Sequence, residues 1–120
     1  MTKEEFYNKW LRAFATNIPK KDIQKYVKSY IWHIFSWKLL SEKQYLFGEK
    51  AKEAYDKIDK KGAIYIEWFE EKHTNDITPD LNTANALDEF VEVYVVGKDF
   101  KWTYIKTHEG MCGPYFMKSK

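Results

Sequence analysis

The chain has 120 residues, of which 44% are hydrophobic and 32% are charged, and its formal net charge is +2. This length predicts one domain covering residues 1–120. No apolar run approaches the ~20 residues of a membrane-spanning helix, so no membrane partner is expected. A charged N-terminal segment without a signal peptide, together with a single cysteine, favours a cytoplasmic protein.

Charge is distributed unevenly along the chain. Residues 1–61 carry 14 basic and 8 acidic side chains, residues 62–100 carry 2 and 9, and residues 101–120 carry 4 and 1. The basic excess is almost all lysine, whereas specific nucleic-acid readers depend on arginine, so no nucleic-acid partner is expected. Aromatic residues make up 18% of the chain, which predicts that some aromatic surface stays exposed.

Two helices are predicted in the first third of the chain. Thr2 and Glu5 have the spacing of a capping box, and the apolar residues that follow recur at helical intervals. A second helix is predicted from Ile23 to about Phe35, because its apolar face continues over that whole stretch. Residues 30–37 also fit a strand that is buried on both faces.

A third helix is predicted after Ser41, which forms a capping-box pattern with Gln44. Gly62 is predicted to end this helix, because glycine readily adopts the left-handed conformation of a C-terminal cap. The apolar positions of the helices and of the strands beyond them give the predicted core: Phe6, Trp10, Phe14, Val27, Ile31, Ile34, Phe47, Ala51, Ala54, Ile58, Ile66, Val93 and Val95.

The pattern changes to that of strands and turns after Gly62. The fold class is therefore predicted as α+β, with three N-terminal helices packed on one face of a small C-terminal antiparallel sheet. The predicted elements of the second half are a strand at 63–69, a loop at 70–86 with one helical turn near 84–89, a hairpin at 92–107 that turns at Gly97–Asp99, and a last strand at 115–118.

Several strings of the sequence resemble a known family: Trp-His-Ile-Phe-Ser-Trp at 32–37, Phe-Lys-Trp-Thr-Tyr at 100–104, Thr-His-Glu at 107–109 and Gly-Pro-Tyr-Phe at 113–116. The family consists of small stand-alone bacterial proteins, common in bacilli, that are catalogued only as a domain of unknown function. The resemblance implies a bacterial cytoplasmic protein and carries over no activity. The Trp-Thr…Thr-His-Glu portion is also similar to segments of small bacterial proteins that look like immunity factors against toxins.

The reactive side chains of the chain gather near its end. A nucleophilic centre would use Cys112 as thiolate, His108 as base and Glu109 as the group that orients the base. Neighbours on a strand point to opposite faces, so Glu109 is poorly placed for that role. We favour a structural interpretation, in which Thr107, His108 and Glu109 hydrogen-bond to the backbone of the following turn and Cys112 fills space.

A metal site is not predicted. His108 and Cys112 have a spacing that two zinc ligands can share, but zinc needs three or four protein ligands. The others would have to come from His33, His73 or Glu109, of which His33 is predicted to lie in the core and His73 at the surface. No cofactor is expected.

An acidic segment in the middle of the chain is predicted to face a basic protein partner. The predicted binding residues are Asp76, Asp80, Asp88, Glu89 and Tyr115, with Tyr115 as an exposed aromatic anchor, and Glu92 belongs to the same acidic segment. The favoured function is a non-enzymatic protein-binding module, in particular an immunity-type inhibitor of a protein partner. The alternative is a small hydrolase or metal-dependent enzyme that uses the turn around His108, Glu109 and Cys112. The sequence predicts no oligomeric state.

Overall fold

The computed structural model describes residues 1–16, 18–26, 32–36, 40–109 and 113–119. The first half of the chain holds α1 (Lys3–Phe14), α2 (Lys20–Tyr26), α3 (His33–Ser36), the 3-10 turn η1 (Glu42–Gln44), β1 (Tyr45–Phe47) and α4 (Glu49–Lys57). The second half holds β2 (Ile64–Glu67), β3 (Asn75–Asp76), η2 (Pro79–Leu81), α5 (Ala84–Leu87), β4 (Val93–Val96), η3 (Lys98–Phe100), β5 (Trp102–Lys106) and β6 (Tyr115–Lys118).

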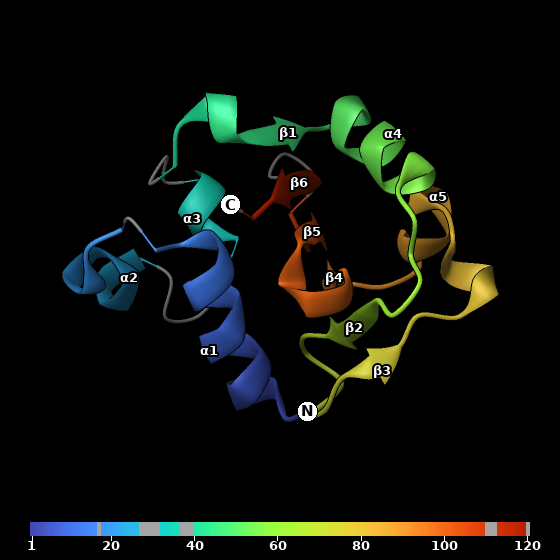
Figure 1. Cartoon of the computed structure of the whole chain (residues 1–120), viewed down its shortest axis with the longest axis horizontal. Helices are drawn as coiled ribbons and strands as arrows, with labels where there is room; N and C mark the ends of the chain where they lie inside the picture. The colour runs from blue at the N-terminus through green and yellow to red at the C-terminus, as the bar shows by residue number, and fades with distance from the viewer. Residues whose placement is uncertain (17, 27–31, 37–39, 110–112, 120) are drawn as a thin grey trace.

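Six antiparallel strands form one sheet in the order β1-β6-β5-β4-β2-β3. Helices cover both faces, with α1, α2 and α3 on one side and α4 and α5 on the other (Figure 1). Successive side chains of a strand point to opposite faces. In β4, Tyr94 and Val96 therefore reach the core under α1, whereas Val93 and Val95 reach the core under α4.

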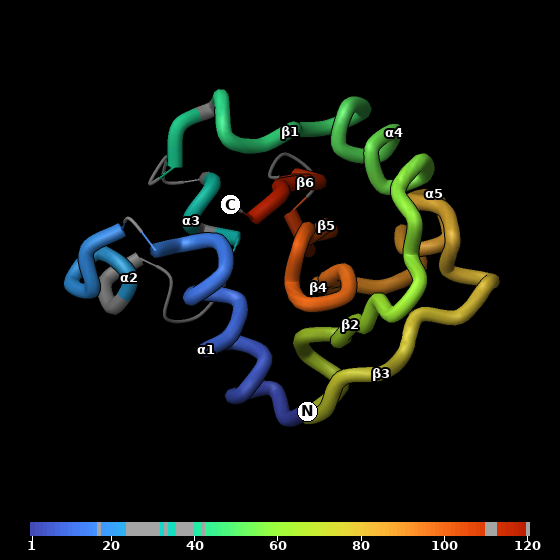
Figure 2. The backbone as a smooth tube through the Cα atoms, viewed as in Figure 1, coloured from blue at the N-terminus to red at the C-terminus, as the bar shows by residue number. Residues whose placement is uncertain are grey.

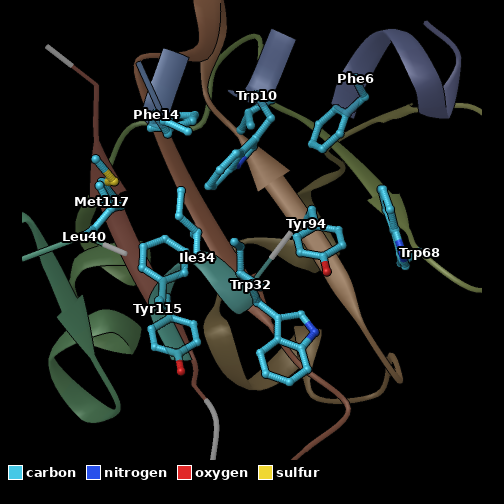
Figure 3. Close-up of a cluster of buried hydrophobic side chains, with 14 of the residues drawn as sticks. Phe6, Trp10, Phe14, Trp32, Ile34, Leu40, Trp68, Tyr94, Tyr115 and Met117 are labelled. Carbon is cyan, nitrogen blue, oxygen red and sulfur yellow. The ribbon is translucent and has the colours of Figure 1, made fainter. Parts of the chain in front are cut away.

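The first helix begins as predicted. The backbone N–H of Glu5 donates to the hydroxyl of Thr2 at 3.1 Å, and the N–H of Thr2 donates back to the Glu5 carboxylate at 3.3 Å. Its apolar stripe faces the sheet, and Figure 3 shows Phe6, Trp10 and Phe14 side by side in that core.

The α+β class is confirmed, but the arrangement of the helices differs from the prediction. The predicted third helix, α4, packs on the opposite face of the sheet from α1. The capping box of Ser41 and Gln44 is present, but it caps the N-terminus of η1 and not that of α4. The strand β1 follows at once and pairs with β6, so a strand lies where helix is predicted. Gly48, with φ +65°, then separates β1 from α4.

The ends of two predicted helices are also corrected. Helix α4 ends at Lys57, and Ile58 already has extended backbone, so Gly62 is not its cap. Gly62 lies in the turn before β2, where its φ of +77° favours glycine. The predicted second helix is not continuous, because Trp32 lies in a turn directly before α3. For residues 33–36 the structure resolves the choice between helix and strand in favour of helix.

Within the described residues, most of the predicted core is buried, and one predicted core residue is exposed. Ala54 and Ile58 are partly buried against the core under α4. Val27 and Ile31 lie outside the described residues. Phe47 is 52% exposed, because β1 is an edge strand of only three residues at the rim of the sheet. The remaining predicted core residues are buried.

Candidate functional site

A buried carboxylate lies at the end of the sheet where β4 begins and β5 ends. Glu92 has no exposed surface. Its Oε1 atom lies 2.7 Å from Nδ1 of His108 and accepts a hydrogen bond from Nε1 of Trp32 at 2.8 Å. Its Oε2 atom accepts from the hydroxyl of Tyr94 at 2.6 Å. We call these four residues the Glu92 centre.

The strand pattern explains how these side chains meet. Glu92 and Tyr94 are two residues apart, so both point toward the core under α1. Trp32 enters the same core from the turn before α3, and Figure 3 shows its indole nitrogen and the Tyr94 hydroxyl directed toward the same space. Val93 pairs with Lys106, so the chain that continues beyond β5 reaches Glu92.

The centre is stabilised because the buried carboxylate has several donors. An unpaired buried charge is strongly unfavourable. Besides the three side chains, the backbone N–H of His108 points at Oε1 of Glu92 at 3.4 Å. Hydrogen bonds to a charged group contribute about 1.5–3 kcal/mol each. The centre therefore fixes the start of α3, the start of β4 and the connection between β5 and β6 relative to one another.

The imidazole of His108 is held between two aromatic rings. The rings of Trp32 and Phe69 lie edge-on to it, with centroids 5.6 and 5.5 Å away. Its Nε2 atom lies 3.6 Å from Oε1 of Glu109, and 27% of its side-chain surface is exposed. A histidine with a carboxylate on Nδ1 keeps one tautomer and presents Nε2 to its surroundings. This arrangement suits a structural anchor and also an oriented base.

The carboxylate that holds His108 is one that the sequence analysis did not consider for this role. Glu92, and not Glu109, makes the close contact with the imidazole, and Glu109 is exposed. Glu92 also cannot face a partner as part of the acidic segment, because it is buried. One signal was available in the sequence: Glu92 is the single charged residue in the apolar run 91–96, in register with Tyr94 on one face of the strand.

The predicted hydrogen bonding of the turn is found in part. The hydroxyl of Thr107 donates to the backbone carbonyl of Glu109 at 2.8 Å. Nδ1 of His108 lies 2.7 Å from Oε1 of Glu92, a contact that the sequence did not predict. Cys112, the third residue of the candidate nucleophilic centre, lies outside the described residues.

Residues 3–116 match the family described as Domain of unknown function (DUF4275). The chain belongs to this family. The match covers almost the whole sequence, including every residue of the Glu92 centre. No curated protein and no solved structure matches the chain significantly.

Lys3 brings a positive charge to the edge of the Glu92 centre. Its Nζ atom donates to the carbonyl of Trp68 at 2.5 Å and lies 4.1 Å from the centre of the Trp68 ring. Burial lowers the pKa of Lys3, and the negative charge of Glu92 opposes that shift. The N-terminal segment is held there by a backbone bridge between Thr2 and His73, and Figure 2 shows the N-terminus beside β3.

The predicted binding residues do not form one group with the Glu92 centre. Asp76, Asp80, Asp88 and Glu89 are exposed, and Asp88 lies 3.8 Å from Nζ of Lys52. Tyr115 is not at the surface, because it is 4% exposed and its ring stacks on Phe35 at a centroid distance of 4.6 Å. Strand β6 lies inside the sheet, and its odd-numbered side chains face the core under α1.

Two cavities lie away from the Glu92 centre. One of about 1110 Å³ lies between α1 and α2, and one of about 590 Å³ lies between α1 and the β4–β5 hairpin. Neither is lined by a residue of the Glu92 centre. Within the described residues, no group of three or more His, Cys, Asp or Glu side chains is arranged to hold a metal ion. Over the same residues, no helix is long and apolar enough to cross a membrane.

Proposed function

We propose that this chain is a non-enzymatic protein-binding module of the bacterial cytoplasm, acting as an immunity-type inhibitor of a protein partner. The observation that carries this proposal is the bonding of His108. Its Nδ1 atom meets a fully buried carboxylate, and its ring is packed between Trp32 and Phe69. A side chain that is bonded and packed in this way limits the movement of the exposed residues that contact it. Rigid surfaces are favourable for binding, since less conformational entropy is lost on association.

A second candidate function is a small hydrolase, and a specific observation favours it. Glu92 holds Nδ1 of His108, as the buried carboxylate of a catalytic triad holds its histidine. Nε2 would then be the atom that removes a proton from the thiol of Cys112. Glu92 takes the role that the sequence suggested for Glu109.

The reactivity of Cys112 distinguishes the two functions, because it requires no knowledge of a substrate. We expect iodoacetamide to label the folded wild-type protein as it labels an ordinary thiol, with a rate that rises toward pH ~8.5. His108→Ala should lower the melting temperature, because it removes a donor from buried Glu92. His73→Ala is the matched control, since His73 is exposed, and it should leave both measurements unchanged.

The opposite result supports the hydrolase. Labelling of the wild type would then be fast near pH 6 and would slow in His108→Ala, with an unchanged melting temperature. A protein unfolded in urea gives the reference rate for an accessible, unactivated Cys112. Labelling slower than this reference at every pH agrees with the binding module.

A further inference from the structure

The apolar side chains of Phe69 and Val91 are exposed next to the Glu92 centre. The N–H of Trp68 donates to the carbonyl of Glu92 at 2.9 Å, so the chains of β2 and β4 stay paired one residue beyond the strands. Phe69 and Val91 are the next residue on each chain, and they are 49% and 52% exposed. Because Trp68 and Glu92 are paired, Phe69 and Val91 lie on neighbouring chain segments at one end of the sheet, and exposed hydrophobic residues that gather in one place often mark a site of protein interaction. We call this pair and its acidic rim the Phe69–Val91 surface.

Phe69 of this surface contacts His108 of the Glu92 centre. The ring of Phe69 lies edge-on to His108 at a centroid distance of 5.5 Å, and His108 is fixed by Glu92. Backbone pairing fixes the preceding residue, Trp68, whose ring packs edge-on against Tyr94 at 4.9 Å. The two anchors are therefore held in place before a partner arrives, which reduces the entropic cost of binding.

The rim of the surface is acidic. Glu70, Glu89 and Glu109 are exposed and each lies within two residues of Phe69, Val91 or His108 along the chain. Burial raises the pKa of Glu67, and the negative charges of Glu70 and Glu71 raise it further.

The nearest lysines compensate this charge only in part. Nζ of Lys106 donates to the carbonyl of Phe90 and lies 3.4 Å from that of Val91, and Nζ of Lys3 donates to the carbonyl of Trp68. Both ammonium groups are thus turned onto backbone oxygens. Lys72 is an exposed cation that follows the rim residues in sequence. Near the two apolar side chains in sequence, the exposed carboxylates Glu70, Glu89 and Glu109 therefore outnumber the exposed cation Lys72.

We propose that the Phe69–Val91 surface binds a cationic protein segment that inserts an apolar side chain between its lysines or arginines. This deepens the proposed function and rests on it. An apolar centre with a polar rim is the general arrangement of a protein–protein interface. The rim steers a positively charged partner and repels nucleic acid and anionic surfaces.

The first test measures binding of short fluorescein-labelled peptides by anisotropy. A peptide that alternates lysine with leucine should bind, and one that alternates lysine with serine should bind at least about tenfold more weakly, because it lacks the anchor. A peptide that alternates glutamate with leucine should not bind. Raising the salt concentration from roughly 0.05 to 0.5 M should weaken the lysine–leucine complex, since exposed charges are screened.

The second test locates the binding site with matched variants. Phe69→Ser should weaken binding at least about tenfold, as expected for a hot-spot residue. Phe47→Ser is its control, because Phe47 is similarly exposed but lies on β1, which three strands separate from β2 in the sheet. Glu89→Lys should also weaken binding, whereas Glu53→Lys on α4 should not. If Phe69→Ser lowers the melting temperature, Val91→Ser is used in its place and should also weaken binding.

Four results would overturn this inference. They are no binding of the lysine–leucine peptide, equal binding of the lysine–serine peptide, equal effects of Phe47→Ser and Phe69→Ser, and a dimer in sedimentation experiments that Phe69→Ser abolishes. The last would make a second copy of the chain the occupant. If binding fails while Cys112 labels as an ordinary thiol, the proposed function stands and only this surface is wrong. If Cys112 labels fast near pH 6, the proposed function itself is wrong.

Discussion

Replacing His108 by alanine tests the structural role of the Glu92 centre directly. The change removes the 2.7 Å contact at Oε1 of Glu92, while Trp32 and Tyr94 still donate to the carboxylate. Loss of one bond to a charged, buried group costs about 1–3 kcal/mol. The lower half of this range is expected, because the His108 side chain is 27% exposed and water can replace part of it.

This loss corresponds to a measurable change in melting temperature. The entropy of unfolding is about 2.1 cal/mol/K per residue, or ~0.25 kcal/mol/K for a chain of this length, so 1 kcal/mol corresponds to ~4 °C. His108→Ala should therefore melt ~4–8 °C below the wild type, as followed by circular dichroism at neutral pH. The variants Glu92→Gln and His108→Ala/Glu92→Gln complete a double-mutant cycle. Coupled residues typically show an interaction free energy of about 0.5–3 kcal/mol.

Two outcomes would refute this reasoning. A coupling free energy below ~0.3 kcal/mol would show that His108 and Glu92 do not stabilise one another. A melting temperature for His108→Ala equal to that of the wild type, combined with reduced thiol labelling, would show a reactive and not a structural histidine. His73→Ala is the matched control here as well.

Further predictions concern the core and the hairpin. The hydroxyl of Tyr104 is buried without a hydrogen-bond partner among the described residues, so Tyr104→Phe should raise the melting temperature. Tyr55→Phe should lower the melting temperature, because the Tyr55 hydroxyl donates to a backbone carbonyl at 2.7 Å. Burial raises the pKa of both tyrosines in the folded state above their unfolded pKa of ~10. The free energy of unfolding should therefore be constant below pH ~10 and fall as the pH rises above it. Urea unfolding from roughly pH 9 to 11 measures this change. Gly97→Ala should unfold or strongly destabilise the protein in a thermal melt, because a Cβ there would lie 2.1 Å from Nε1 of Trp102. Trp10→Ala should cost about 3–5 kcal/mol in denaturant unfolding, since Trp10 is fully buried. An unchanged midpoint would contradict each of these predictions.

The sequence predicted the elements whose signals are local. The capping box at Thr2, the hairpin around Gly97 and the last strand at 115–118 are all found, because each depends on residues a few positions apart. The helical turn predicted near 84–89 is also found, as α5.

The elements that the sequence did not predict depend on distant partners. β1 has only three residues, and it is a strand because β6, which lies 70 residues further along the chain, pairs with it in the register Tyr45↔Met117. The placement of α4 on the second face of the sheet depends on the same long-range pairing, since β1 leads the chain past the sheet edge. Periodicity within a window cannot detect such contacts.

The sequence singled out His108 but not the residues that surround it in the structure. His108 stood out because reactive residues gather near it, whereas its partner Glu92 is 16 positions away and Trp32 is 60 positions away from Glu92. Nothing local distinguishes Glu92 from the exposed carboxylates that precede it, except that it shares a strand face with Tyr94. Tyr115 was assigned to the surface for a similar reason, since its burial follows from the position of β6 inside the sheet.

The buried carboxylate links the internal structure to the exposed surface. Replacing a buried ion pair with apolar side chains is often neutral or stabilising, so stability alone is a weak reason to keep Glu92 and His108. Their distinctive effect is positional: donors from the α3 turn, β4 and the β5–β6 connection converge on one carboxylate. Phe69 rests on the histidine that this carboxylate holds, at the end of the sheet where the acidic rim is exposed. His108→Ala, assayed well below its melting temperature, should therefore bind the lysine–leucine peptide less tightly than the wild type, because Phe69 loses the side chain that positions it.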